Sequence, residues 1–178
     1  TGAKVSRGKL RSLLPVFEEQ AVDRDLLVEG AGELAEYFQA EGYFDAKVRF
    51  TSETSPDGRL HIVYAVNRGE RQKLAALLFQ GNRFFDAARL REQMLMAPAS
   101  FQIRRGRFSP ALLTHDVEAI ADLYRASGFR GVTVSPRVER GYRGKRGDIA
   151  VHIVIEEGPQ WFVETAAFEG VSPEHAAA

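Results

Sequence analysis

The sequence contains an internal repeat, which restricts the possible folds more than any other feature of the chain. A shift of 86 residues pairs apolar with apolar residues and glycine with glycine: Leu34 with Ile120, Phe38 with Tyr124, Gly42 with Gly128 and Val48 with Val134. After a three-residue insertion, a shift of 89 residues pairs the apolar residues Leu60, Ile62, Tyr64 and Val66 with Ile149, Val151, Ile153 and Ile155. Self-similarity at a fixed offset marks a repeated structural unit. The chain is therefore predicted to be a tandem of two related modules.

Two helices are predicted within the second, more complete copy. Asp86 suits the N-cap of the first helix, and Ser109 followed by Pro110 suits the start of the second. Four apolar residues follow at helical spacing and would form one buried stripe: Leu113, Val117, Ile120 and Tyr124. Gly128 is predicted to end this helix, because glycine adopts the left-handed backbone of a helix C-terminus at little cost.

Three strands complete this copy. Residues 74–79 are a short apolar run before a turn, whereas residues 132–138 and 149–155 alternate between apolar and polar side chains. Pro136 has no N–H to donate, which places its strand at an edge and the last strand in the centre. A hairpin partner is antiparallel and a strand reached through helices is parallel, so the sheet is expected to be mixed.

The element order of this copy predicts the fold class. A three-stranded sheet needs cover over its apolar face, which the two helices would provide. We therefore expect an α/β (α+β) fold of tandem β-α-α-β-β modules, each a three-stranded mixed sheet covered on one face by two helices. Residues 1–69 are assigned to a first module without its opening strand, and residues 70–159 to a complete second module. Residues 160–178 would supply the opening strand of a third module.

The first copy is predicted to follow the same order from its first helix onward. That helix is expected over Ser6–Leu14, and Asp23 would cap a second one. A hairpin of residues 45–52 and 59–67 would follow. Since residues 161–168 resemble a strand without its module, they could fill the gap in a neighbouring molecule and form a swapped dimer.

Composition restricts the possible functions. The 24 lysines and arginines balance 24 aspartates and glutamates, so a global attraction to nucleic acid or an anionic membrane is not expected. The chain has no cysteine, which excludes disulfides, thiol catalysis and cysteine-based zinc sites. No apolar run is long enough for a membrane-spanning helix.

The sequence also offers little for catalysis. Its four histidines are scattered without the spacing of metal ligands: His61, His115, His152 and His175. No serine lies in a nucleophile motif, and the neighbouring carboxylates Glu156 and Glu157 would not converge across a cleft as a catalytic pair does. We therefore expect no enzyme, no metal and no cofactor.

Short motifs recur in a defined order along nearly the whole chain. They stand after the first strand, before the second helix, at the end of that helix and after the last strand: Phe79-Gln80-Gly81-Asn82, Gly106-Arg107-Phe108-Ser109, Tyr124–Phe129 with its echo Phe38–Tyr43, and Glu156-Glu157-Gly158-Pro159. Together they resemble the polypeptide-transport-associated (POTRA) domains of the BamA/TamA-like outer-membrane protein assembly family. Three features depart from the pattern: Val171 replaces an asparagine, Arg68-Gly69-Glu70 replaces the Glu-Gly-Pro ending, and no glycine precedes the cap at Asp23.

The resemblance implies a periplasmic location within an outer-membrane protein whose β-barrel lies outside these residues. It implies a scaffold for outer-membrane protein insertion or secretion, with unfolded outer-membrane or secreted polypeptides and accessory envelope proteins as partners and no nucleic acid. A docking array for fixed envelope-complex partners is the alternative. Many unrelated unfolded clients would favour the first reading, and one tight partner the second.

An edge strand is the predicted client site, because its unpaired N–H and C=O groups can pair with an extended peptide. Pro136 removes one such donor from the second module's edge. The edge of the first module is uninterrupted and is the better candidate: Ala46, Lys47, Val48, Arg49, Phe50, Thr51 and Ser52. The alternative is that this edge is simply solvated.

Two basic clusters are candidates for contact with lipid phosphates or a partner. The first comprises Arg104, Arg105 and Arg107. The second adds an aromatic residue and comprises Arg140, Tyr142, Arg143, Lys145 and Arg146. An RNA backbone is a further candidate and predicts an affinity that falls steeply with salt. The neutral total charge favours the simpler alternative of two solvated loops.

Overall fold

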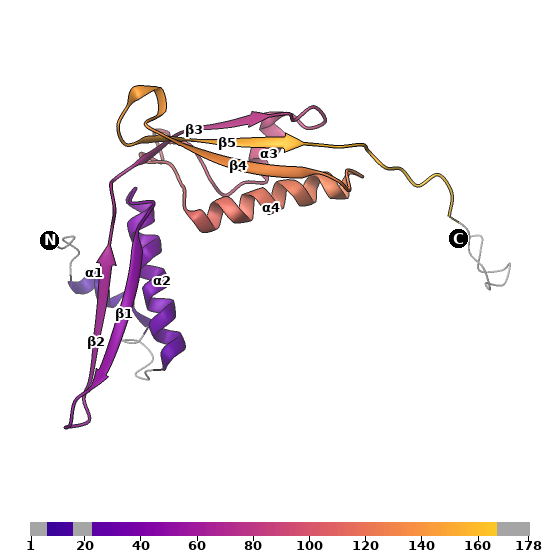
Figure 1. The fold of residues 1–178 in the computed structure, drawn as a ribbon. Helices are drawn as coiled ribbons and strands as arrows, with labels where there is room; N and C mark the ends of the chain where they lie inside the picture. Colours follow the sequence, from indigo (N-terminus) through magenta and orange to yellow (C-terminus); the bar gives the residue numbers. More distant parts are fainter. Residues whose placement is uncertain (1–6, 16–22, 167–178) are drawn as a thin grey trace, which may run out of the picture.

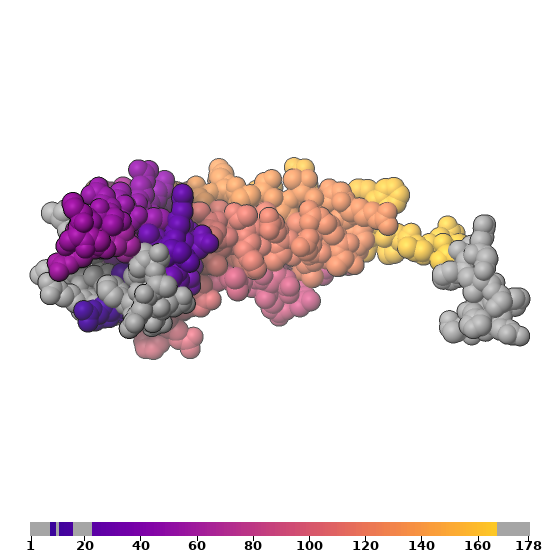
Figure 2. Space-filling model, turned by 90° about the horizontal axis from the view of Figure 1, so that it is seen from below, coloured from indigo at the N-terminus to yellow at the C-terminus, as the bar shows by residue number. Residues whose placement is uncertain are grey.

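The computed structural model describes residues 7–15 and 23–166, which form two modules. The first module contains α1 (Arg7–Arg11), α2 (Arg24–Ala40), β1 (Lys47–Thr54) and β2 (Leu60–Asn67). The second contains β3 (Lys73–Gln80), α3 (Ala87–Glu92), α4 (Pro110–Ala126), β4 (Thr133–Arg140), the short 3-10 helix η2 (Tyr142–Gly144) and β5 (Asp148–Glu156). Figure 1 shows the first module meeting the second at one end, and Figure 2 shows the second running away from that end.

The sheet of the second module has the order β3-β5-β4. β5 is parallel to β3 and antiparallel to β4, so the predicted mixed sheet with a central last strand is confirmed. Pro136 lies on the edge strand β4, opposite Ile153 of β5. The helices cover one face of this sheet, where Ile149, Val151 and Ile153 are at most 1% exposed. The predicted α+β arrangement is confirmed.

Capping side chains begin the helices where the sequence predicts. Asp23 accepts a hydrogen bond from the Leu26 N–H at 2.8 Å and begins α2. Asp86 and Ser109 begin α3 and α4 in the same way. Each cap satisfies a backbone N–H that has no partner within its own helix.

The first module repeats the register of the second. Phe50 of β1 lies opposite Tyr64 of β2, as Pro136 lies opposite Ile153. The two hairpins therefore match residue for residue, which extends the repeat from the sequence to the strand pairing. In the described residues, however, the sheet of the first module contains only β1 and β2.

The strand-end motifs of the second module are joined by Glu157. Its Oε1 accepts hydrogen bonds from the Arg83 and Phe84 N–H groups at 2.7 and 2.8 Å and from the Tyr124 hydroxyl at 2.9 Å. Gly81 has a φ of +82°, and a Cβ there would lie 2.0 Å from the Ile155 carbonyl oxygen. Only glycine fits this crossing, which holds the end of β3 against the end of β5.

One expectation from the sequence differs from the structure, and another stays a prediction. α1 ends at Arg11 rather than Leu14, and Ser6 lies outside the described residues. Residues 161–166 form no strand, while residues 167–168 lie outside the described residues. A strand needs a neighbour to pair with, and the Trp161 N–H instead donates to the Gly128 carbonyl at 2.9 Å. The opening strand of a third module and the module boundaries stay predictions.

No helix in residues 7–15 and 23–166 combines the length and apolar character needed to cross a bilayer.

Candidate functional site

The predicted client edge is the outer side of β1. β1 pairs with β2 along its whole length and has no second strand partner among the described residues. Of the seven residues predicted for this edge, Ala46 precedes the strand. It is buried, and its N–H donates to the Tyr43 carbonyl at 2.9 Å, so it belongs to the turn after α2. The structure therefore reduces the available edge to residues 47–52.

A groove of about 710 Å³ runs between α2 and β1. Its walls come from one face of the helix and from the hairpin: Asp23, Arg24, Leu27, Val28, Ala31, Val48, Arg49, Phe50, Ser52 and Leu60. Val28 and Leu60, on opposite walls of this groove, are 55% and 41% exposed. The candidate edge therefore borders an open and largely apolar surface.

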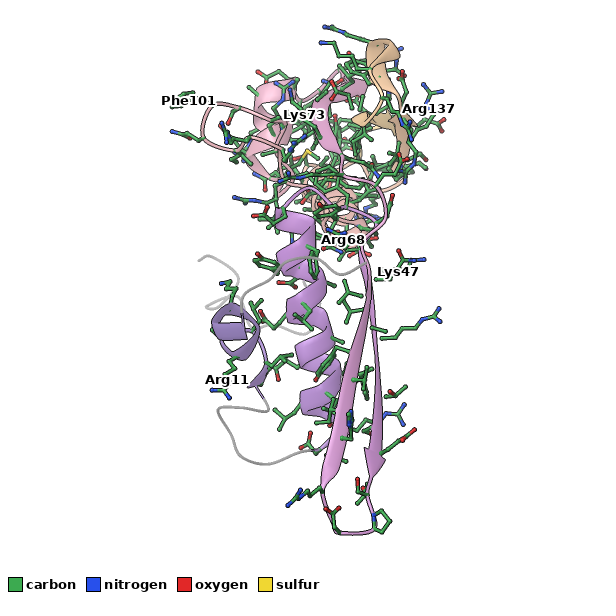
Figure 3. The ribbon with its side chains drawn as sticks, turned by 90° about the vertical axis from the view of Figure 1, so that its left-hand side faces the viewer. Arg11, Lys47, Arg68, Lys73, Phe101 and Arg137 are labelled. Carbon is green, nitrogen blue, oxygen red and sulfur yellow. The ribbon has the colours of Figure 1, made fainter. Side chains whose placement is uncertain are left out.

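Val48, Phe50 and Ser52 alternate along β1 and line this groove, and Arg49 between them reaches its rim. Val48 and Phe50 are half-buried toward α2, and the Phe50 ring lies 6.1 Å from that of Tyr64. Lys47 and Arg49 are exposed, and Figure 3 shows Lys47 pointing away from α2. A strand added to this edge would place every second side chain over the groove.

The backbone groups of β1 alternate in the same way. Proline fits an edge strand where its nitrogen faces away from the sheet. Pro136 and Phe50 hold equivalent positions in the two hairpins, so the Phe50 N–H is expected to face away from β2. By alternation the Val48 N–H faces outward too, and the Arg49 N–H faces β2.

The turn after α2 connects the first module to the second through a buried aromatic residue. Phe44 is fully buried within the second module's core, and its ring packs edge-on against Phe108 at 5.3 Å. The Gln72 N–H donates to the Gly42 carbonyl at 2.7 Å, immediately before β3. Gly42 and Phe44 thus belong to the first module in sequence but contact the second module.

A polar cluster completes the junction. Arg140 contacts both carboxylate oxygens of Asp45 at 3.0 Å, and Gln72 donates to the same carboxylate at 2.7 Å. The hydrogen bond from Arg140 holds the pKa of the Asp45 carboxyl below its ordinary value, against the opposing effect of burial. Because bidentate arginine–carboxylate pairs are directional, this cluster fixes the orientation of one module on the other.

The structure separates the members of the basic clusters. Arg140 belongs to the junction, and Arg146 pairs with Glu70 at 2.8 Å. Arg143 lies over the Tyr142 ring at 5.2 Å, and Lys145 is exposed beside it. In the first cluster, the side chain of Arg105 packs near Gly42 and Arg107 lies by the Leu95 carbonyl, while Arg104 is exposed. Within residues 7–15 and 23–166, no three potential metal ligands converge.

Comparison of the sequence with models of known protein families identifies the type of domain. The POTRA model, described as a surface antigen variable number repeat, matches residues 1–69 and again residues 73–158. The chain belongs to the POTRA family. POTRA domains are non-catalytic scaffolds, so the function of this chain is sought in its binding surfaces.

Solved structures show the same POTRA fold. POTRA domains 3 to 5 of Haemophilus influenzae BamA share 19% identity over 84% of this chain and 55% of that one, with a TM-score of 0.51. BamA from Haemophilus ducreyi lacking POTRA domains 1–3 shares 18% identity over 88% of this chain and 27% of that one, with a TM-score of 0.62. The chain therefore spans about half and about a quarter of the lengths of these two structures.

Sequence reasoning missed several residues that position these POTRA surfaces. Asp116 is fully buried, and its two oxygens accept the Leu95 and Met96 N–H groups at 2.8 Å, which fixes the loop between α3 and α4. The sequence could have indicated this role, because Asp116 lies one helical turn before Ile120 and so falls on the predicted apolar side of α4. Phe44 and Asp45 gave no comparable signal, because their partners lie in the other module.

Proposed function

We propose that this chain is a periplasmic polypeptide-binding scaffold of an outer-membrane protein assembly, insertion or secretion factor, and that clients add as a strand to β1. The main support is the contrast between an uninterrupted edge beside an apolar groove and an equivalent edge that carries Pro136. Backbone hydrogen bonds would supply affinity for many sequences, and the groove would accept alternate side chains. Unfolded outer-membrane or secreted polypeptides fit this mode of recognition.

The test uses the equivalence of Phe50 and Pro136. Phe50→Pro removes an outward N–H, whereas the control Phe50→Ala removes the ring and keeps the N–H. We expect Phe50→Pro to weaken binding of a labelled eight-residue peptide of alternating apolar and polar residues about tenfold relative to Phe50→Ala, because at least one backbone hydrogen bond is lost. Fluorescence anisotropy measures the affinity, and circular dichroism verifies the fold.

Two further variants sharpen this test. Val48→Pro should act like Phe50→Pro, while Arg49→Pro should disrupt the β1–β2 hairpin, since its N–H faces β2. The reverse exchange, Pro136→Phe, should give the second module a weak binding edge of its own. Equal affinities for Phe50→Pro and Phe50→Ala, with both folded, would contradict strand addition at β1.

A docking array is the second candidate, favoured by a groove of about 410 Å³ that spans both modules. Small residues of α2 and the start of α4 line much of it, including Gly32, Ala35 and Ala111. Since the junction fixes its shape, such a groove suits one accessory envelope protein of defined surface. Ala35→Trp would fill the groove and abolish binding of that partner while leaving peptide binding to β1 unchanged.

A further inference from the structure

Two loops that are far apart in the sequence meet at the junction end of the second module. The Leu74 N–H donates to the Arg105 carbonyl, and the Lys73 N–H donates to the Gly147 carbonyl, both at 2.8 Å. The start of β3 therefore lies between the loop of residues 99–106 and the loop of residues 141–147. Figure 3 looks onto this end of the molecule and shows Phe101 on one side of Lys73, at the start of β3, and the loop of residues 141–147 on the other side.

Phe101 is completely exposed, at 101% of its reference area. Its loop is nevertheless held by hydrogen bonds, since the Ser100 and Gly106 N–H groups both donate to the Ile103 carbonyl, at 2.9 and 3.0 Å. The Ile103 N–H also donates to the Ser100 hydroxyl. A single exposed apolar side chain is ordinary on a protein surface, so Phe101 indicates a binding surface only together with the charges around it.

The charges around Phe101 are unbalanced in favour of cations. Three nearby carboxylates have a cationic partner: Asp45 with Arg140, Glu70 with Arg146 and Glu41 with Arg71. Arg104, Arg143 and Lys145 are exposed, and none of the three has an ion pair within the described parts of the chain. Asp148, at the start of β5, is the remaining carboxylate beside these loops. This end is therefore locally positive although the whole chain is neutral.

We propose that this basic end, formed by Phe101, Arg104, Arg143 and Lys145, contacts the surface of an anionic phospholipid bilayer. The Phe101 ring enters the boundary between head groups and acyl chains, and the three cations bind lipid phosphates. Arg140 and Arg146 take no part, since Asp45 and Glu70 neutralise them. An exposed aromatic ring beside unpaired cations favours a lipid surface over an acidic polypeptide, because the ring then gains an apolar environment.

The test is cosedimentation of the 178-residue chain with vesicles of phosphatidylcholine containing phosphatidylglycerol, against vesicles of phosphatidylcholine alone. Arg104→Glu and Lys145→Glu are each expected to weaken binding to the anionic vesicles about fivefold or more, and the double variant more than twentyfold. Phe101→Ser is expected to weaken it about tenfold. Arg143 is left unchanged because its backbone is left-handed, with a φ of 53°.

Arg130→Glu provides the matched control, since Arg130 is exposed after α4 and before β4, at the end of the sheet opposite the 141–147 loop. It changes the net charge as Lys145→Glu does and is expected to leave vesicle binding unchanged. Equal losses for Arg130→Glu and Lys145→Glu would overturn the proposal, as would full binding by Phe101→Ser. Absence of vesicle binding together with charge-dependent binding to polyglutamate would also overturn it, in favour of an acidic polypeptide.

Discussion

The two modules share one strand register, yet they cover their last strand to different extents. Ile149 of β5 is 1% exposed, whereas Leu60, at the equivalent position of β2, is 41% exposed. β5 lies between two strands, while β2 has one strand neighbour in the described chain. The same sequence pattern therefore produces a closed core in one module and an accessible apolar surface in the other.

Polar contacts also join the elements of the second module more closely than those of the first. Glu157 of the second module connects β5 to α4 and to the loop after β3. Arg68 holds the equivalent position in the first module, where it donates to the Tyr43 hydroxyl at 3.3 Å and lies over that ring. Phe38 stands where the second module has Tyr124, so the hydroxyl near this position comes from Tyr43 and contacts an arginine instead of a carboxylate. The second module is the more closely connected of the two.

The largest effect is expected from Phe44→Ala, which tests whether the modules are separate at all. Phe44 belongs to the first module in sequence but packs in the second core. Its removal should lower the free energy of unfolding of the second module by about 3–5 kcal/mol, as for other buried phenylalanines. Urea denaturation measures this loss. A change below about 1 kcal/mol would mean that the second core does not depend on this residue.

A smaller loss of stability is expected when alanine replaces Ile149, and a smaller one still when it replaces the equivalent residue Leu60. Ile149→Ala should cost about 2–5 kcal/mol, because it leaves a cavity in a closed core. Leu60→Ala should cost less than about 1 kcal/mol, since that side chain is partly exposed already. Denaturation of both variants under one condition gives the comparison. Similar costs at the two positions would show that the first module is as closed as the second.

The smallest effect concerns acid stability and Glu157. Burial alone would raise the pKa of this carboxyl, but hydrogen bonds from Phe84, Tyr124 and Arg83 outweigh burial and lower the pKa. The resulting stability is present above the unfolded pKa of about 4.3 and is lost as the pH falls through the folded pKa. Glu157→Gln should therefore cost about 1 kcal/mol at pH 7. The difference in unfolding free energy between this variant and the wild type should shrink between about pH 5 and pH 3. A difference that stays constant with pH would mean that the variant is destabilised by altered packing and not by loss of the carboxylate charge.

Features that rest on local rules were predictable from the sequence. The helix caps Asp23, Asp86 and Ser109, the edge position of Pro136 and the central place of β5 are confirmed. Each depends on residues within a single element or on the order of elements, which the sequence displays directly. The candidate groove was not predicted, because it depends on how closely α2 approaches β1.

Features that depend on distant partners were not predictable. Gly30 would be expected only to weaken α2, yet a Cβ there would lie 2.9 Å from the Tyr64 hydroxyl. The glycine makes room for the buried hydroxyl of this half-buried tyrosine, whose pKa burial raises. The junction of Phe44, Asp45 and Arg140 likewise joins residues nearly a hundred positions apart. No periodicity or motif in the sequence records such a contact.

The junction also has a mechanical consequence. Since an aromatic contact and a bidentate ion pair hold the turn after α2 against the second module, the β1–β2 hairpin cannot pivot independently there. The hairpin extends away from this point (Figure 1). The hairpin therefore has the geometry of a lever arm, in which a small rotation of the second module would swing the hairpin tip through a larger arc.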